Sequence, residues 1–223
     1  IAETNSTQLR GMERCRNFCE VIVAGRQISG KGRRGNLWVD TLDAGIAASF
    51  ILPLVEQEFL SIAMAVAMAR TAELITQESG KIKWPNDLFY FGKKCGGVLI
   101  EKSTHDSFIV GIGINVLNRI WPDHLKNSVI TLEEVSKRKM SRIDVLLELI
   151  NQVDWALSQD EKVLEEFFKT RCLLTDKVVI ISEGDYELQG TVRRIDPFRG
   201  LEIETESGLQ WVKGALASIK EIL

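Results

Sequence analysis

The densest potential for chemistry lies in residues 30–35, where three glycines and three cationic side chains occupy six consecutive positions. Glycine lets backbone N–H groups approach a ligand closely, and lysine and arginine bring positive charge to the same point. Backbone donors and cations together favour an anion, for which phosphate is a typical candidate. We therefore expect a loop that receives a phosphate-bearing ligand.

Two other interpretations of this stretch remain open at this point. The same residues match the G-x-G-x-x-G dinucleotide fingerprint, but its mechanism requires the third glycine to open a helix. Residues 36–41 (NLWVDT) are instead typical of a strand, which disfavours a dinucleotide loop. The simpler alternative is a solvated basic turn.

Further residues with chemical potential occur later in the chain. Lys83 ends a short alternating stretch before an Asn-Asp turn, and Lys94 begins the first of two glycine-bearing strand candidates, 94–101 and 108–115. Taken singly, lysines at strand ends are usually solvated. Together with the basic loop, they suggest a polyanionic ligand with a flat part, which ATP fits. Attack of a carboxylate on its α-phosphate would need positioned cations and Mg²⁺ more than a protein nucleophile.

The elements that must position these residues follow from the hydrophobic pattern. Apolar runs and alternation predict strands at 21–24, 46–52, 81–84 and 88–91, and 3.6-residue periodicity predicts helices at 59–75, 132–138, 141–157 and 160–170. From about residue 175, short alternating strands separated by turns predict a small β-barrel of SH3 type. We expect an α+β fold, a mixed or antiparallel sheet with packed helices, divided into residues 1–174 and 175–223.

Composition excludes several classes of protein. The net charge of -3 and the pI of about 5.6 imply no bulk attraction to nucleic acid or to an acidic membrane. No apolar run approaches the roughly 18 residues of a membrane span. The four cysteines, Cys15, Cys19, Cys95 and Cys172, complete no zinc set and fit free thiols in a reducing cytoplasm. We therefore expect a cytoplasmic protein with neither nucleic acid nor membrane as a partner.

Five ordered motifs now carry a resemblance to a known family, the biotin protein ligases. Ser6-Thr7-Gln8 resembles S-T-N/Q, and residues 27–38 (QISGKGRRGNLW) resemble Q-T-x-G-R-G-R-x-G-R-x-W. Residues 83–87 reproduce K-W-P-N-D, residues 93–101 (KKCGGVLIE) resemble R-K-x-x-G-I-L-x-E, and residues 111–116 match G-I-G-I-N-V. The C-terminal strands are similar to the family's SH3-like domain.

The resemblance implies a two-step reaction on a catalytic domain like that of class II aminoacyl-tRNA synthetases. Biotin and ATP would form biotinyl-5'-AMP and pyrophosphate, and biotin would pass to one lysine of the biotin carboxyl carrier protein of acetyl-CoA carboxylase. The catalytic residues implied are Lys94 first, then Lys83 and Lys31. Those implied for biotin are Ser6, Thr7, Gln8, Gln27, Lys31, Gly32, Arg33, Lys94, Gly96, Gly97 and Gly113. Those implied for the nucleotide are Arg33, Arg34, Trp38, Lys83, Trp84, Asn86 and Asn115, and Asn86 and Asp87 would help to hold Mg²⁺.

Some features depart from the family pattern or leave alternatives open. Lys31 and Asn36 stand where arginine is usual, and Thr4-Asn5 is a competing register for the first motif. Lipoate ligases share the fold class, and a biotin-binding sensor without transfer activity is an alternative of another class. The ligase motifs begin at once, so no DNA-binding domain is expected, and a homodimer is possible. Repulsion among Lys31, Arg33 and Arg34 should keep the basic loop open until an anion arrives.

Overall fold

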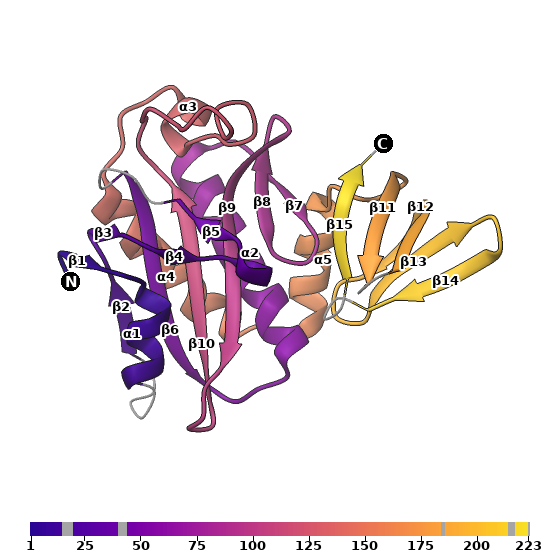
Figure 1. Cartoon of the computed structure of the whole chain (residues 1–223), viewed down its shortest axis with the longest axis horizontal. Coiled ribbons are helices and arrows are strands. Elements are labelled where there is room, and N and C mark those ends of the chain that lie inside the picture. Colours follow the sequence, from indigo (N-terminus) through magenta and orange to yellow (C-terminus); the bar gives the residue numbers. More distant parts are fainter. Residues whose placement is uncertain (15–19, 40–43, 184–185, 214–216, 223) are drawn as a thin grey trace.

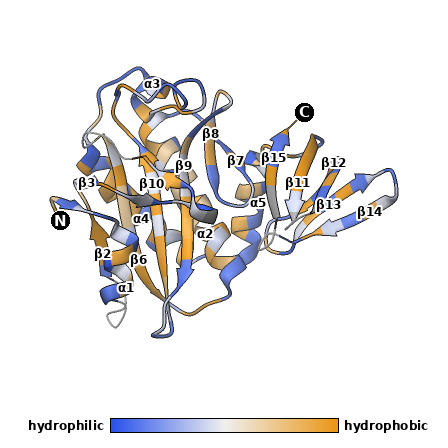
Figure 2. Ribbon diagram, in the orientation of Figure 1, coloured by the Kyte–Doolittle hydropathy of each residue, from blue (hydrophilic) through white to orange (hydrophobic). Residues whose placement is uncertain are grey.

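A six-stranded antiparallel sheet forms the centre of the computed structural model, which describes residues 1–14, 20–39, 44–183, 186–213 and 217–222 (Figure 1). Its strand order is β2-β6-β10-β9-β8-β7. The bounds are β2 Glu20–Val23, β6 Gly45–Pro53, β7 Lys81–Lys83, β8 Asp87–Tyr90, β9 Lys93–Lys102 and β10 Ser107–Asn115. The central strands are strongly hydrophobic, while hydrophilic residues gather at the loops (Figure 2). This pattern confirms the expected α+β class.

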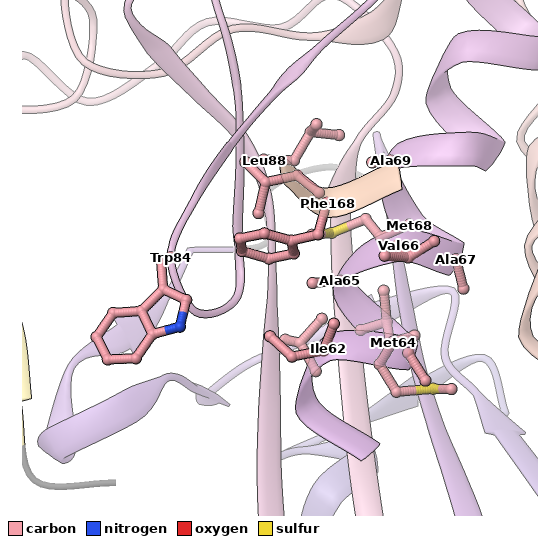
Figure 3. Packing of buried hydrophobic residues seen from close by; sticks show 14 of the residues in the cluster. Ile62, Met64, Ala65, Val66, Ala67, Met68, Ala69, Trp84, Leu88 and Phe168 are labelled. Carbon is pink, nitrogen blue, oxygen red and sulfur yellow. The ribbon is translucent and has the colours of Figure 1, made fainter. Parts of the chain in front are cut away.

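Helices cover one face of this sheet, behind the strands in Figure 1. They are α2 Gln57–Thr76, α3 Leu132–Ser136, α4 Arg142–Leu157 and α5 Glu161–Arg171. Helix α2 lies against the sheet, and its alanines allow close approach because they carry no bulk beyond Cβ. Phe168 of α5 packs near Met68 of α2 and Leu88 of β8, and all three are fully buried (Figure 3).

Helix α2 corrects the expectation that no segment is long and apolar enough to cross a membrane. Residues Gln57–Thr76 meet that criterion of length and composition, with a hydropathy of 1.5, but 67% of the apolar window is buried inside the protein. A core helix passes the same test, because both environments select apolar side chains all round the helix.

Short elements lie on the opposite face of the sheet. They are β1 Glu3–Thr4, α1 Thr7–Arg14, β3 Arg26–Gln27, β4 Gly30–Lys31, the 3₁₀ turn η1 Arg33–Gly35 and β5 Leu37–Trp38. Ser6 caps α1, since its Oγ accepts a hydrogen bond of 3.2 Å from the Gln8 N–H. The strand expected over 36–41 is seen only at β5, and residues 40–43 lie outside the described part of the chain.

A second, five-stranded antiparallel sheet follows α5 and lies beside the first (Figure 1). Its strands are β11 Val178–Glu183, β12 Tyr186–Asp196, β13 Gly200–Thr205, β14 Gly208–Val212 and β15 Ala217–Ile222. The sequence pattern missed β15, which pairs with β11. The Trp84 Nε1–H donates to the Pro197 carbonyl at 3.2 Å, and the rings of Phe59 and Phe198 stack with centroids 6.5 Å apart. The expected division after Leu174 falls in the connection between α5 and β11.

The described cysteines, Cys95 and Cys172, are free and buried. Burial raises the pKa of the Cys172 thiol to about 11, and it raises the pKa of Cys95 still further. Cys15 and Cys19, considered as half of a zinc set, lie outside the described residues. Within the described ranges no cluster of three His, Cys, Asp or Glu residues forms a metal site.

Candidate active site

A cleft of about 360 Å³ lies on the face of the sheet opposite α2. One row of paired residues runs straight across its floor, because the strand registers pair Lys83 with Asp87, Asp87 with Gly97, Gly97 with Gly113, and Gly113 with Ala47. Paired residues in adjacent strands project to the same face of a sheet. Side chains of β7 and β8 are thus brought beside two glycines of β9 and β10.

The two glycines of this row lie beneath large side chains. A Cβ on Gly113 would stand 2.5 Å from Trp38 Cε2, so the indole of β5 rests directly on the Gly113 backbone. A Cβ on Gly97 would stand 2.8 Å from Asp87 Oδ1 and 3.2 Å from Lys94 Nζ. Of the three glycines implied for biotin beyond the basic loop, Gly97 and Gly113 thus form the floor of the cleft, where only glycine allows these contacts. Gly96 does not belong to it: its Cβ position faces Met68 Sδ at 2.8 Å, on the helix side of the sheet.

A β-bulge decides where Lys94 points. Leu88 pairs with Gly96, but Phe89 pairs with Lys94, so Cys95 is an extra residue on β9. Without the bulge, simple alternation would place Lys94 on the same face as Gly96. The extra residue re-aims the strand, so Cys95 is buried in the core and Lys94 lines the cleft. The Lys94 ammonium then lies 2.7 Å from Asp87 Oδ1.

Lys83 lies at the end of the row but does not line the cleft. Its Nζ is 5.9 Å from the centre of the Phe89 ring. Burial lowers the pKa of Lys83, while Asp87 raises this pKa and Lys94 lowers it further. The catalytic and nucleotide-binding roles implied for Lys83 therefore stay predictions.

Neutral polar side chains line the other end of the cleft. Gln27 Oε1 accepts hydrogen bonds from the Thr7 N–H at 2.8 Å and from the Thr7 hydroxyl at 3.1 Å. Ser49 Oγ lies 2.9 Å from Thr7 Oγ1 and 3.1 Å from Gln8 Oε1. All four side chains are buried, and Gln8 also donates to the Ile109 carbonyl at 2.8 Å. The cluster is therefore rigid and offers both donors and acceptors.

The basic loop forms a small hairpin, β4 and β5 joined through η1, in front of β9 and β10 (Figure 1). Arg33 Nη1 donates to Asn86 Oδ1 at 3.0 Å, and Lys31 Nζ lies 3.9 Å from Glu101 Oε1. These two contacts counter the repulsion among the cations and hold the loop over the cleft. The side chain of Arg34 lies outside the described part of the structure. Opening of the loop without ligand stays a prediction.

Besides Lys83, two more residues expected near the nucleotide lie outside the cleft. Asn115 is buried beneath it: its Nδ2 donates to the Lys94 carbonyl at 3.4 Å and to the Ile130 carbonyl at 3.3 Å. It thus supports the backbone of Lys94. Trp84 is also buried and lines a second cavity beside the cleft. Asn86 borders both cavities, because its loop passes between them.

Sequence reasoning missed several residues of the cleft. Ser49 lies within the apolar run 46–52 and pairs with Gly111, whose Cβ position is 2.7 Å from Gln8 Oε1. A small polar residue inside a buried run was the available signal. Ile219 and Lys220 come from β15, and no local pattern could place them here.

Comparison with known proteins decides which family has this arrangement. The fold matches the solved structure of the Aquifex aeolicus biotin protein ligase in complex with biotin and ATP, with a TM-score of 0.90 and 30% identity, over 99% of this chain and 97% of that one. The chain belongs to the biotin protein ligase family. Residues 17–116 also match the model of the biotin/lipoate A/B protein ligase family.

Relatives known from sequence agree with this membership. The bifunctional ligase/repressor BirA of Bacillus spizizenii is 34% identical over 140 residues, covering 58% of this chain. The chain spans only 43% of the length of that relative. The biotin–[acetyl-CoA-carboxylase] ligase of Mycobacterium tuberculosis is 26% identical over 213 residues, which cover 88% of this chain and 79% of the relative. The resemblance drawn from the five motifs is therefore confirmed.

Proposed function

We propose that this protein is a biotin protein ligase that activates biotin with ATP and transfers it to a carrier protein. One observation carries the proposal: a rigid, neutral polar cluster and a cationic site share one glycine-floored cleft under a basic hairpin. The cluster of Thr7, Gln8, Gln27 and Ser49 suits the ureido ring of biotin, which carries donors and acceptors but no charge. The adjacent cations suit a carboxylate and a phosphate.

Adenylation is the first step that this geometry supports. Lys94 is the cation to which we assign stabilisation of the α-phosphate and of the biotin carboxylate. Arg33 on the hairpin approaches from above, and Gly32 lets the hairpin backbone come close. Trp38 over Gly113 offers a flat surface for the adenine. Positioned charges of this kind lower the barrier because negative charge builds up on the phosphoryl oxygens.

Transfer is the second proposed step. An uncharged lysine amine of the carrier would attack the biotinyl carbonyl, and AMP would leave. We assign to Asp87, which is paired with Lys94, the acceptance of the proton that the attacking amine loses. The name of the Mycobacterium relative mentions acetyl-CoA carboxylase, and we propose a biotin carboxyl carrier protein of that enzyme as the acceptor here.

Magnesium does not find a ready-made protein site at Asn86 and Asp87. The side-chain oxygen Oδ1 of Asn86 already accepts a hydrogen bond from Arg33, and Asp87 Oδ1 is paired with Lys94 at 2.7 Å. A metal there would compete with two cations for its ligands. Any Mg²⁺ would therefore depend on the ATP phosphates for its ligands.

A radiochemical assay tests the proposal. The protein would be incubated with [α-³²P]ATP and biotin, and a carrier domain would then be added. We expect a biotin-dependent adenylate that disappears as the carrier is labelled with biotin. Absence of the adenylate would contradict the proposal. An adenylate without transfer would favour a sensor, the reading suggested by Lys31 and Asn36 in place of the usual arginines.

A further inference from the structure

A second cavity of about 480 Å³ lies next to the main cleft, between the first turns of α2, the loop after β7 and the turn from β12 to β13. Strand β8 pairs with β9 only as far as Gly97, so the following residues of β9 have no β8 partner and border this space. Arg33 lines it, but the adenylation and transfer steps proposed above place no part of a ligand in this second cavity.

The two cavities meet at one hydrogen bond. Arg33, Asn86 and Val98 line both of them, and Arg33 donates to Asn86 at 3.0 Å at their junction. A turn of the Arg33 side chain would therefore connect the cationic part of the cleft with the second cavity. An anion that leaves the cleft beside Arg33 would enter this space while keeping one of its cationic partners.

The charge of the second cavity favours such an anion. Its described lining includes three cations, Arg33, Arg199 and Lys213, but only one carboxylate, Glu58. Arg199 is 85% exposed, and its nearest carboxylate oxygen, on Asp196, is 3.7 Å away. A loosely paired arginine keeps its fork of donors available for phosphate oxygens. Stacking of Phe198 on Phe59 fixes the turn that carries Arg199.

We propose that the second cavity binds the pyrophosphate released by adenylation, with Arg33 as the gate and Arg199 and Lys213 as its far partners. The proposal rests on the proposed function. In that step a biotin carboxylate oxygen forms a bond to the α-phosphorus, and the bond from this phosphorus to the bridging oxygen breaks. That oxygen leaves with the electron pair as part of pyrophosphate. The second sheet thereby takes part in the first half-reaction.

The test compares the wild type with an Arg199→Ala/Lys213→Ala double variant and with Lys177→Ala, which removes an exposed cation just before β11, away from both cavities. Sodium pyrophosphate and AMP serve as inhibitors of biotinyl-AMP formation. We expect the inhibition constant of pyrophosphate to rise at least tenfold in the double variant and that of AMP to change less than twofold. Lys177→Ala should match the wild type in both.

Calorimetric titration with sodium pyrophosphate separates this proposal from the proposed function, because it needs no turnover. Binding by the wild type and its loss in the double variant, at an unchanged melting temperature, would support the cavity even if no adenylate formed. An unchanged pyrophosphate constant in the double variant would overturn the assignment even if adenylation proceeded normally. Equal losses in the double variant and in Lys177→Ala would also overturn it, since they would reflect net charge alone.

Discussion

Lys94 Nζ lies 2.7 Å from Asp87 Oδ1, and the pair rests on the bare backbone of Gly97. Two features of β9 make this pair possible. The bulge at Cys95 turns Lys94 toward the cleft, and Gly97 leaves room for both side chains. The side chains of Lys94 and Asp87 are 34% and 27% exposed, so the pair contributes little to stability. Its place on the cleft floor points to chemistry instead.

Replacing Lys94 with alanine should therefore remove activity and leave the fold intact. We expect adenylate formation to fall by about 10²–10³-fold, the usual cost of one group that stabilises transition-state charge. Circular dichroism should show an unchanged melting curve. Lys102→Ala, which removes an exposed lysine from the same strand, is the matched control. Normal turnover by Lys94→Ala would refute the catalytic assignment.

Gly113→Ala should displace Trp38, since the new methyl group would stand 2.5 Å from the indole. Overpacking of this kind lowers the free energy of unfolding by about 1–3 kcal/mol. We also expect weaker ATP binding and altered tryptophan fluorescence. In a Trp38→Ala background, Gly113→Ala should leave the free energy of unfolding and the ATP affinity almost unchanged. Full additivity of the two substitutions would show that they do not act through this contact.

Ser49→Ala tests the polar cluster. The change removes the hydroxyl that Thr7 and Gln8 share as a hydrogen-bond partner. This loss should lower the free energy of unfolding by about 1–3 kcal/mol. Biotin affinity measured by calorimetry should fall by roughly tenfold or more, whereas ATP affinity measured without biotin should stay the same. An equal loss for both ligands would mean that the cluster only supports the fold.

Lys31→Arg should hold the basic hairpin more firmly. Lys31 is 3.9 Å from one oxygen of Glu101, and the other oxygen is buried without a hydrogen bond within the described residues. An arginine guanidinium can bind both oxygens of the Glu101 carboxylate in bidentate geometry. We expect the adenylate to dissociate a few-fold more slowly and the ligand-free loop to resist protease longer. Glu101→Gln should cancel this gain; if it persists, another partner is responsible.

Glu133 makes the stability of the fold depend on pH. The backbone N–H groups of Asn118 and Met140 donate to its carboxylate at 2.8 Å and 3.1 Å. The Asn118 bond lowers the pKa of Glu133, burial opposes this effect, and the Met140 bond and Lys139 lower it further. Because the folded-state pKa is lowered, this stabilisation is complete above the carboxyl's unfolded pKa. It is lost as the pH falls through the folded-state value.

Urea unfolding at pH 7 and in acid would measure this effect. Glu133→Gln should lower the free energy of unfolding at pH 7 by about 1–3 kcal/mol, and the difference from the wild type should shrink as the pH falls. The control is Glu166→Gln, which changes an exposed carboxylate and should show neither effect. A loss that stays constant with pH would indicate a purely steric cause.

The sequence by itself determined the family, most of the elements and most of the cleft residues. Local patterns sufficed, because the hydrophobic period fixes which face of a strand or helix is buried, and the motifs at 27–38, 83–87 and 93–101 carry the chemistry. The cap at Ser6 and the long helix α2 also follow from short-range rules. The periodic pattern predicts this helix over 59–75, and the structure extends it by two residues at the start and one at the end.

The tertiary structure decided which of these residues meet. Gly96 and Gly97 are neighbours with the same local signal, yet only Gly97 lies under the Lys94–Asp87 pair, since successive residues of a strand face opposite sides. Lys94 reaches the cleft only through a bulge defined by its pairing with β8. Ser49 joins Thr7 and Gln8 across the fold, and Arg199 and Lys213 line the second cavity together with residues of the first sheet. Such contacts depend on strand register and on packing between distant segments, which no local pattern records.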